Sequence, residues 1–313
     1  MAAVKMSTNA TFPENPDWMS RLPAHLHETP LNQLAIPGCH DSGSYKFDKN
    51  GGVGPDADQI VKDLEKLFGP FIKDILYRWA KTQNMNFAQQ LTAGMRYFDL
   101  RVATRQGTED LYFLHSLYAD KVEPCLHEMD IFLDAHPKEV IILDFNHLYA
   151  MTDVIHGQLI SMILEVFGHK VCPLLDMNSL TLDMLWSNKL QVIVIYHHQI
   201  ALENYQIWPG SIIRSPWANT TDANNLVQYL ENVYDSGHNE DIFLSYQGVL
   251  TADTSYVITH VADSLKTALA DKASPAVVKW LSNKVPGPNK LNICIIDFGD
   301  QYNFMSTVLA LNK

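Results

Sequence analysis

The 313-residue sequence has few of the features that mark secreted, membrane-spanning or nucleic-acid-binding proteins. Its four cysteines are far apart and form no CxxC pair, so we expect reduced thiols in a cytosolic or nuclear protein. No apolar run approaches the roughly 20 residues of a transmembrane helix, and the N-terminus has no apolar stretch of signal-peptide length. These absences predict a protein with no transmembrane segment.

Basic residues are also scarce relative to acidic ones. The chain has 23 Lys and Arg against 35 Asp and Glu, which gives a net charge of −12, and no block of like charge reaches five residues. An acidic protein is repelled by phosphate backbones, so we expect no nucleic acid partner. An anionic membrane surface attracts it no better, and any lipid contact must therefore be local.

What the sequence does have is a series of short apolar runs of strand length. Several are nearly continuous in Val, Ile, Leu and Phe, which is typical of parallel strands buried on both faces. We predict eight strands, at residues 31–37, 95–102, 111–115, 139–146, 190–197, 211–217, 241–249 and 291–298.

Stretches with helical spacing of apolar residues lie between most of these strands. They cover residues 56–81, with a break at Gly69 and Pro70, and residues 121–135, 153–168, 221–234 and 254–283. Alternating strands and helices predict an α/β fold, and eight strands in this length predict a TIM-type (β/α)8 barrel.

One link does not suit a regular barrel. Only ATRQGTED joins the second and third predicted strands, and a parallel crossover normally needs a dozen or more residues. We therefore expect a single irregular barrel with one helix missing. The barrel is expected to span residues 15–313, after an N-terminal lead-in at 1–14.

Ionisable side chains are concentrated at the carboxyl ends of the predicted strands, where barrel enzymes place their active sites. Residues two apart on a strand face the same side, so Asp99 and Arg101 are expected to share one face. The polar residues at these ends are His40, Asp41, Asp99, Arg101, His115, Asp144, Asn146, His197, His198 and Asp297.

Each of these residues also has a structural interpretation. Asp99 and Arg101 by themselves would be a buried ion pair, and a single histidine in a chain with 13 is usually structural. We assign His197 and His198 to this structural class because no partner motif supports them. With His40 and His115 at the same rim, however, a catalytic role for the set becomes the better hypothesis.

Two histidines, carboxylates and an arginine suffice to cleave a phosphodiester without a metal. The same region could instead hold a divalent cation through His40, Asp41, Asp99, His115 and Asn146, and its oxygen ligands would suit Mg²⁺ or Ca²⁺. Arg101 argues against this, because a fixed cation repels a metal ion and its guanidinium fork can itself bind a phosphate.

Three motifs carry a resemblance to a known family. LAIPGCHDSGSY, QLTAGMRYFDLRV and LYFLHSLY resemble the X region of phosphatidylinositol-specific phospholipases C, and EVIILDFNH, SPWANTT and ICIIDF extend the match over about residues 15–313. The pattern looks most like the small X domain-containing proteins of this family. The resemblance implies a lipid-degrading enzyme of signal transduction that cleaves phosphatidylinositol at a membrane surface.

The resemblance also implies a role for individual residues. His40 matches the general base that deprotonates the inositol 2-hydroxyl, and Asp297 matches the carboxylate that orients it. His115 matches the general acid, Arg101 the phosphate-binding arginine, and Asp41 and Asp99 the neighbouring carboxylates. Lys189 and Trp217 fall near positions that contact the inositol ring.

Departures from the larger eukaryotic enzymes imply that no cofactor, Ca²⁺ in particular, is needed. Those enzymes bind Ca²⁺ through an amide after the first histidine and three carboxylates, whereas this chain has Asp41, Asp99, Arg101 and Asn146 at those positions. Asn146 also replaces the lysine of the bacterial enzymes, and we expect it to contact the substrate. The alternatives are a phosphoinositide-binding barrel with weak turnover and a metal-dependent glycerophosphodiester phosphodiesterase.

Overall fold

The α/β barrel predicted from the strand and helix pattern is confirmed. The computed structural model describes residues 14–48, 50–57, 63, 67, 71–237 and 239–313. Eight strands form one curled parallel sheet in the order β7-β6-β5-β2-β1-β10-β9-β8. They are β1 (Ile36–Cys39), β2 (Tyr97–Thr104), β5 (Ile141–Tyr149), β6 (Val192–Tyr196), β7 (Trp208–Pro209), β8 (Ile213–Arg214), β9 (Phe243–Gln247) and β10 (Ile293–Ile296).

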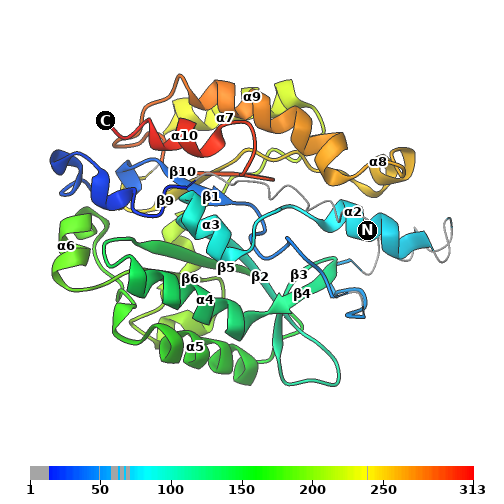
Figure 1. Cartoon of the computed structure of the whole chain (residues 1–313), viewed down its shortest axis with the longest axis horizontal. Helices are drawn as coiled ribbons and strands as arrows, with labels where there is room; N and C mark the ends of the chain where they lie inside the picture. The colour runs from blue at the N-terminus through cyan, green and yellow to red at the C-terminus, as the bar shows by residue number, and fades with distance from the viewer. Residues whose placement is uncertain (1–13, 49, 58–62, 64–66, 68–70, 238) are drawn as a thin grey trace, which may run out of the picture.

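Helices cover the outside of this sheet on opposite sides, with α4 and α5 on one and α7, α9 and α10 on the other (Figure 1). The helices are α2 (Ile72–Ala80), α3 (Phe87–Ala93), α4 (Val122–Ala135), α5 (Asp153–Phe167), α6 (Leu182–Ser187), α7 (Ala223–Ser236), α8 (Thr254–Thr259), α9 (Asp271–Leu281) and α10 (Phe304–Leu309). A π-helix, η9 (Lys266–Ala270), runs directly into α9. No helix in the described part of the chain is long and apolar enough to cross a membrane.

Alternation along the strands separates two apolar layers. Phe98, Leu100 and Val102 belong to the cluster that packs under the helices, as predicted. Tyr97, on the other face of β2, belongs to a second cluster inside the barrel. Successive side chains point to opposite faces, so Asp99 and Arg101 point into the barrel as Tyr97 does. They lie toward the carboxyl ends of the strands.

The third predicted strand is present but has a different place from the one expected. β3 (Leu111–His115) pairs antiparallel with β2, and β4 (Leu117–Lys121) pairs antiparallel with β3. Neither strand belongs to the parallel path. The prediction of a crossover with its helix missing is therefore wrong, because a link this short permits a hairpin and no parallel crossover.

β7 takes the eighth place in the sheet, and it was not predicted because a strand of two residues carries no periodicity. The first and sixth predicted strands are also shorter than expected. Residues Leu31–Gln33 form a 3₁₀ helix before β1, and 211–217 contributes only Ile213–Arg214. Of the predicted helix at 56–81, residues 58–62, 64–66 and 68–70, including the break at Gly69 and Pro70, lie outside the described residues, as does most of the lead-in.

Candidate active site

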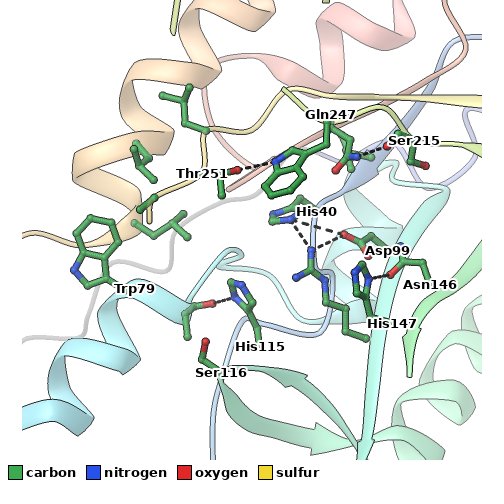
Figure 2. Close-up of a pocket in the computed structure, with 18 of the residues that line it drawn as sticks. His40, Trp79, Asp99, His115, Ser116, Asn146, His147, Ser215, Gln247 and Thr251 are labelled. Carbon is green, nitrogen blue, oxygen red and sulfur yellow. Dashed lines mark hydrogen bonds and ion pairs between the residues drawn. The ribbon is translucent and has the colours of Figure 1, made fainter. Parts of the chain in front are cut away.

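The polar strand ends meet in one cavity of about 480 Å³. Of the nine predicted site residues, six line this cavity: His40, Asp99, Arg101, His115, Asn146 and Trp217. Asp41 and Asp297 lie directly behind it, in contact with the lining histidines and arginine. Figure 2 shows His40, Asp99 and His115 pointing toward one another from different strands.

Sharp turns aim these side chains into the cavity. The residues that follow His40, His115 and Asp297 all have left-handed backbone conformations, with φ of 41° at Asp41, 59° at Ser116 and 51° at Phe298. Such conformations are uncommon for residues other than glycine and concentrate at functional sites. The chain therefore turns abruptly directly after His40, His115 and Asp297.

His40 lies between a carboxylate and a guanidinium. Its Nδ1 is 2.7 Å from Oδ1 of Asp297, and its Nε2 is 2.8 Å from Nη2 of Arg101. An arginine only donates, so Nε2 accepts and Nδ1 carries the proton given to Asp297. Burial by itself lowers the pKa of His40, but Asp297 opposes this through its charge and hydrogen bond, and the net pKa is raised.

Arg101 balances two buried carboxylates. Its Nε is 3.4 Å from Oδ2 of Asp41, and its Nη2 is 3.6 Å from Oδ2 of Asp99. Burial by itself raises the pKa of Asp99, but Arg101 and His40 outweigh that effect and hold this pKa at about 2. Burial by itself lowers the pKa of Arg101, but the charges of Asp41 and Asp99 outweigh this effect and the net pKa is raised. Asp99 and Arg101 are therefore both charged at neutral pH.

His115 faces His40 across the cavity, with ring centroids 6.3 Å apart and nearly perpendicular planes. Its Nδ1 is 2.6 Å from the carbonyl oxygen of Ala80, at the end of α2, and 3.5 Å from Oδ2 of Asp41. A carbonyl accepts, so Nδ1 donates and Nε2 is left to face the cavity. The Asp41 carboxylate therefore lies beside this ring as well as beside Arg101.

Asn146 connects the second and fifth strands. Its Nδ2 donates to Oδ1 of Asp99 at 2.7 Å, and its Oδ1 is 2.6 Å from Nδ1 of His147. A break in strand register between Leu100 and Arg101 brings Arg101 opposite His147. Asn146 therefore orients Asp99 and lines the cavity, while its contact with the substrate stays a prediction.

His197, interpreted above as structural, lines the cavity, and its Nε2 is 2.8 Å from Oδ1 of Asp144. Burial lowers the pKa of His197, but its hydrogen bond to Asp144 outweighs this and the net pKa is raised. Asp144 also accepts a hydrogen bond from the Tyr97 hydroxyl at 2.6 Å. His198 lies away from this group and stacks on His156 at 3.9 Å.

The two residues predicted to contact the inositol ring have different outcomes. Trp217 lies at the rim, half exposed, and its Nε1 donates to Oγ1 of Thr251 at 2.8 Å. Lys189 is exposed and precedes β6, so it lies at the amino end of that strand and away from the cavity. A contact between Lys189 and a substrate in this cavity is therefore excluded.

Sequence reasoning missed several other residues of the cavity wall. Ser215 and Gln247 meet where the Gln247 Nε2 donates to the Ser215 carbonyl at 2.7 Å, and Figure 2 shows both beside the polar residues. Gln247 ends β9 and could have been found by its position at the end of an apolar run. Apolar residues of α2 and α8 carry no such signal, because their packing against the cavity depends on the fold.

The donor set does not suit Ca²⁺. This ion takes roughly six to eight oxygen ligands, whereas the Arg101 guanidinium contacts both Asp41 and Asp99. Within the described residues, no group of three or more His, Cys, Asp or Glu side chains is arranged to hold a metal ion.

Comparison with known proteins identifies the family. The chain is 41% identical over 298 residues to human PI-PLC X domain-containing protein 3, covering 95% of this chain and 93% of that protein. It is 42% identical over 300 residues to mouse PI-PLC X domain-containing protein 2, covering 95% and 88%. This chain belongs to the PI-PLC X domain-containing protein family. Human PI-PLC X domain-containing protein 1 is more distant, at 33% over 306 residues, and no protein-family model matches the chain.

Solved structures agree with the fold. The phosphatidylinositol-specific phospholipase C of Listeria monocytogenes superposes with a TM-score of 0.65 at 21% identity, covering 96% of this chain and 99% of that one. A structure of the Staphylococcus aureus phosphatidylinositol-specific phospholipase C has a TM-score of 0.68 at 16% identity, covering 96% and 98%. This chain thus has the barrel fold of these bacterial phospholipases.

Proposed function

We propose that this protein is a phosphodiesterase that cleaves phosphatidylinositol into diacylglycerol and inositol phosphate, with the cyclic phosphate formed first. The observation that carries the proposal is the pair of imidazoles 6.3 Å apart, one bound to the Asp297 carboxylate and the other to a main-chain carbonyl. Both rings are held through Nδ1, which leaves each Nε2 for proton transfer with a substrate. Paired acid and base catalysis needs two such groups, one that takes a proton and one that gives it.

His40 acts as the general base. Because Nδ1 donates to Asp297, the lone pair of Nε2 is available to take the proton of the inositol 2-hydroxyl. The oxygen then attacks the adjacent phosphorus. Asp297 stabilises the imidazolium that forms, in the way that a buried carboxylate orients a catalytic histidine.

Arg101 binds the phosphate and releases His40. Its Nη2 donates to the same Nε2 lone pair that the base needs. A phosphate in the cavity offers this guanidinium a stronger, charged acceptor, so substrate binding frees His40 at the moment it is required. The fork then stabilises charge on the phosphate oxygens as the leaving group departs.

His115 completes the reaction as the general acid. In its protonated form it keeps Nδ1 on Ala80 and gives the Nε2 proton to the diacylglycerol oxygen. Arg101 supplies the positive charge that a metal supplies elsewhere, so we propose that the reaction is independent of Ca²⁺. The lipid is reached by peripheral contact with a membrane surface.

The test is turnover of phosphatidylinositol vesicles by purified protein, with and without EDTA. We expect inositol cyclic phosphate in both conditions, and loss of roughly 10²–10⁴ in rate for His40→Ala and for His115→Ala. His169→Ala, at an exposed histidine outside the cavity, is the matched control and should keep full activity.

Three results would contradict the proposal. Activity retained in either site variant would remove its histidine from the mechanism. Product formed only with added metal would favour a glycerophosphodiester-type enzyme. Binding of vesicles without turnover would favour a phosphoinositide-binding barrel.

A further inference from the structure

The cavity wall has two chemically different halves. Figure 2 shows Trp79 on the side of His115 that is away from Asp99 and Asn146. The polar half contains the phosphate-binding and catalytic groups already described. The other half, here called the apolar arm, is lined by Leu76, Trp79, Leu250, Ala252, Val257, Leu265 and Leu269. An inositol phosphate headgroup is polar and would gain little from contact with such an apolar surface.

The general acid lies at the boundary between these halves. His115 is anchored through Nδ1 to Ala80, and Ala80 ends the same helix α2 that contributes Leu76 and Trp79 to the apolar arm. A general acid must contact the leaving oxygen. The leaving group therefore departs from the phosphorus on the α2 side, toward the apolar arm.

The apolar arm is held together before any ligand binds. Arg78, on α2, donates through Nη2 to the Val261 carbonyl at 2.8 Å and through Nη1 to the Asp263 carbonyl. Trp79 meets Tyr256 of α8 edge to face at 6.1 Å. These contacts fix α2 against the segment that follows β9, so a ligand would meet little ordering cost there.

Burial distinguishes a chain-binding wall from a membrane-inserting ridge. Leu76 is 3% exposed, Trp79 8% and Leu269 1%, so these side chains are recessed in the cavity. A ridge that enters a bilayer must present exposed apolar side chains. Recessed ones can gain contact only if an apolar group comes to them.

We propose that the apolar arm binds the glycerol and the first part of one acyl chain of the substrate, drawing the lipid partly out of its membrane. This inference rests on the proposed function for the direction of the leaving group. The substrate class is then an acylated phosphoinositide, including single-chain lysophosphatidylinositol in free solution. The deacylated compound glycerophosphoinositol fills only the polar half.

The experiment compares these two soluble compounds below the micelle concentration of the acylated one, so that no membrane is present. We expect kcat/KM to be higher for lysophosphatidylinositol than for glycerophosphoinositol. In calorimetry, the inactive His40→Ala variant should bind lysophosphatidylinositol more tightly than it binds glycerophosphoinositol. Ala252→Phe places a ring in the apolar arm and should lower the ratio of the two kcat/KM values about tenfold, the effect of excluding roughly two methylene groups. Ser255→Phe, at an exposed position of α8 that does not line the cavity, should keep the wild-type ratio.

The outcomes separate the two proposals. Equal turnover of both compounds by the wild-type protein overturns the apolar arm and leaves the phosphodiesterase function in place. Tighter binding of the acylated compound by His40→Ala, with no turnover by the wild type, overturns the function and keeps the apolar arm. An equal effect of Ala252→Phe and Ser255→Phe on the ratio also overturns the arm, and the wild-type comparison decides the question if either variant fails to fold.

Discussion

Arg96 directly precedes strand β2, Arg101 lies within it, and the two have opposite hydrogen-bonding states. All five N–H groups of Arg96 donate: Nε and Nη2 to Glu139, Nη1 to the Leu91 and Met95 carbonyls, and Nη2 also to the Pro16 carbonyl. Arg101 donates to a single acceptor among the described residues, Nε2 of His40. Its Nε, although buried, has no hydrogen-bond partner there.

The difference separates an arginine that stabilises the fold from one that we propose is kept for a ligand. A saturated arginine has no donor left, so Arg96 can only stabilise the amino end of the barrel. An unsaturated buried arginine is costly unless a ligand completes it. Burial lowers the pKa of Arg96 despite Glu139, whereas the carboxylates around Arg101 raise its pKa. The same residue type thus has every donor satisfied at one position and a buried donor without a partner at the other.

Removing Arg96 should have the largest effect, on stability. Arg96→Met leaves the fully buried Glu139 carboxylate without its partner, and we expect a loss of about 3–5 kcal/mol in the free energy of unfolding, measured by urea denaturation. The double variant Arg96→Met with Glu139→Met removes the unpaired charge and should recover part of the loss. A single variant as stable as the wild type would end the structural interpretation of this pair.

Changing Arg101 should have the next largest effect, on activity. Arg101→Lys keeps the charge but loses the planar fork, so we expect kcat to fall by about 10²–10³, as when one preorganised donor is removed. The free energy of unfolding should change by less than about 1 kcal/mol, because lysine keeps the positive charge beside the buried Asp41 and Asp99 carboxylates. Unfolding at lower urea together with unchanged kcat would reverse the comparison.

The smallest effect should be a shift in pH dependence. His40 must be neutral to act as a base, and its raised pKa places the acidic limb of kcat/KM above the ordinary histidine pKa of about 6.5. Arg101 lowers the pKa of His40 by its charge, so Arg101→Gln should move this limb to higher pH in the residual activity. Lys189→Ala, at the amino end of β6, should leave the pH profile unchanged. A limb that moves to lower pH in Arg101→Gln would contradict the assigned contact.

Local pattern was enough for most of the barrel. The runs that became β2, β5, β6, β9 and β10 are long and apolar, and their periodicity places Asp99 and Arg101 on one face without any knowledge of neighbours. β7 escaped prediction because two residues are too few to show a pattern. The link between β2 and β3 was correctly judged too short for a parallel crossover. Its consequence, an antiparallel hairpin of β2 and β3, was not predicted.

The site was predictable to the same extent. Residues at strand ends were found because a parallel barrel brings those ends together, and the X region motifs supplied their roles. Lys189 was wrongly assigned to the substrate because it lies between the end of α6 and the start of β6. That link is at the amino ends of the strands, whereas the cavity is at their carboxyl ends. The contact between His197 and Asp144 could not be predicted, because Asp144 lies on another strand and 53 positions away in the chain.

By itself, the sequence determined the fold class, the faces of the strands and the residues at their carboxyl ends, because periodicity and chain order are local properties. Tertiary structure alone decided that Arg101 donates to the lone pair of His40, that His115 is anchored to α2, and that an apolar arm lies beside it. Each of these depends on side chains far apart in the sequence. Their distances are set by how the sheet curls and how α2 packs against it, which no local pattern records.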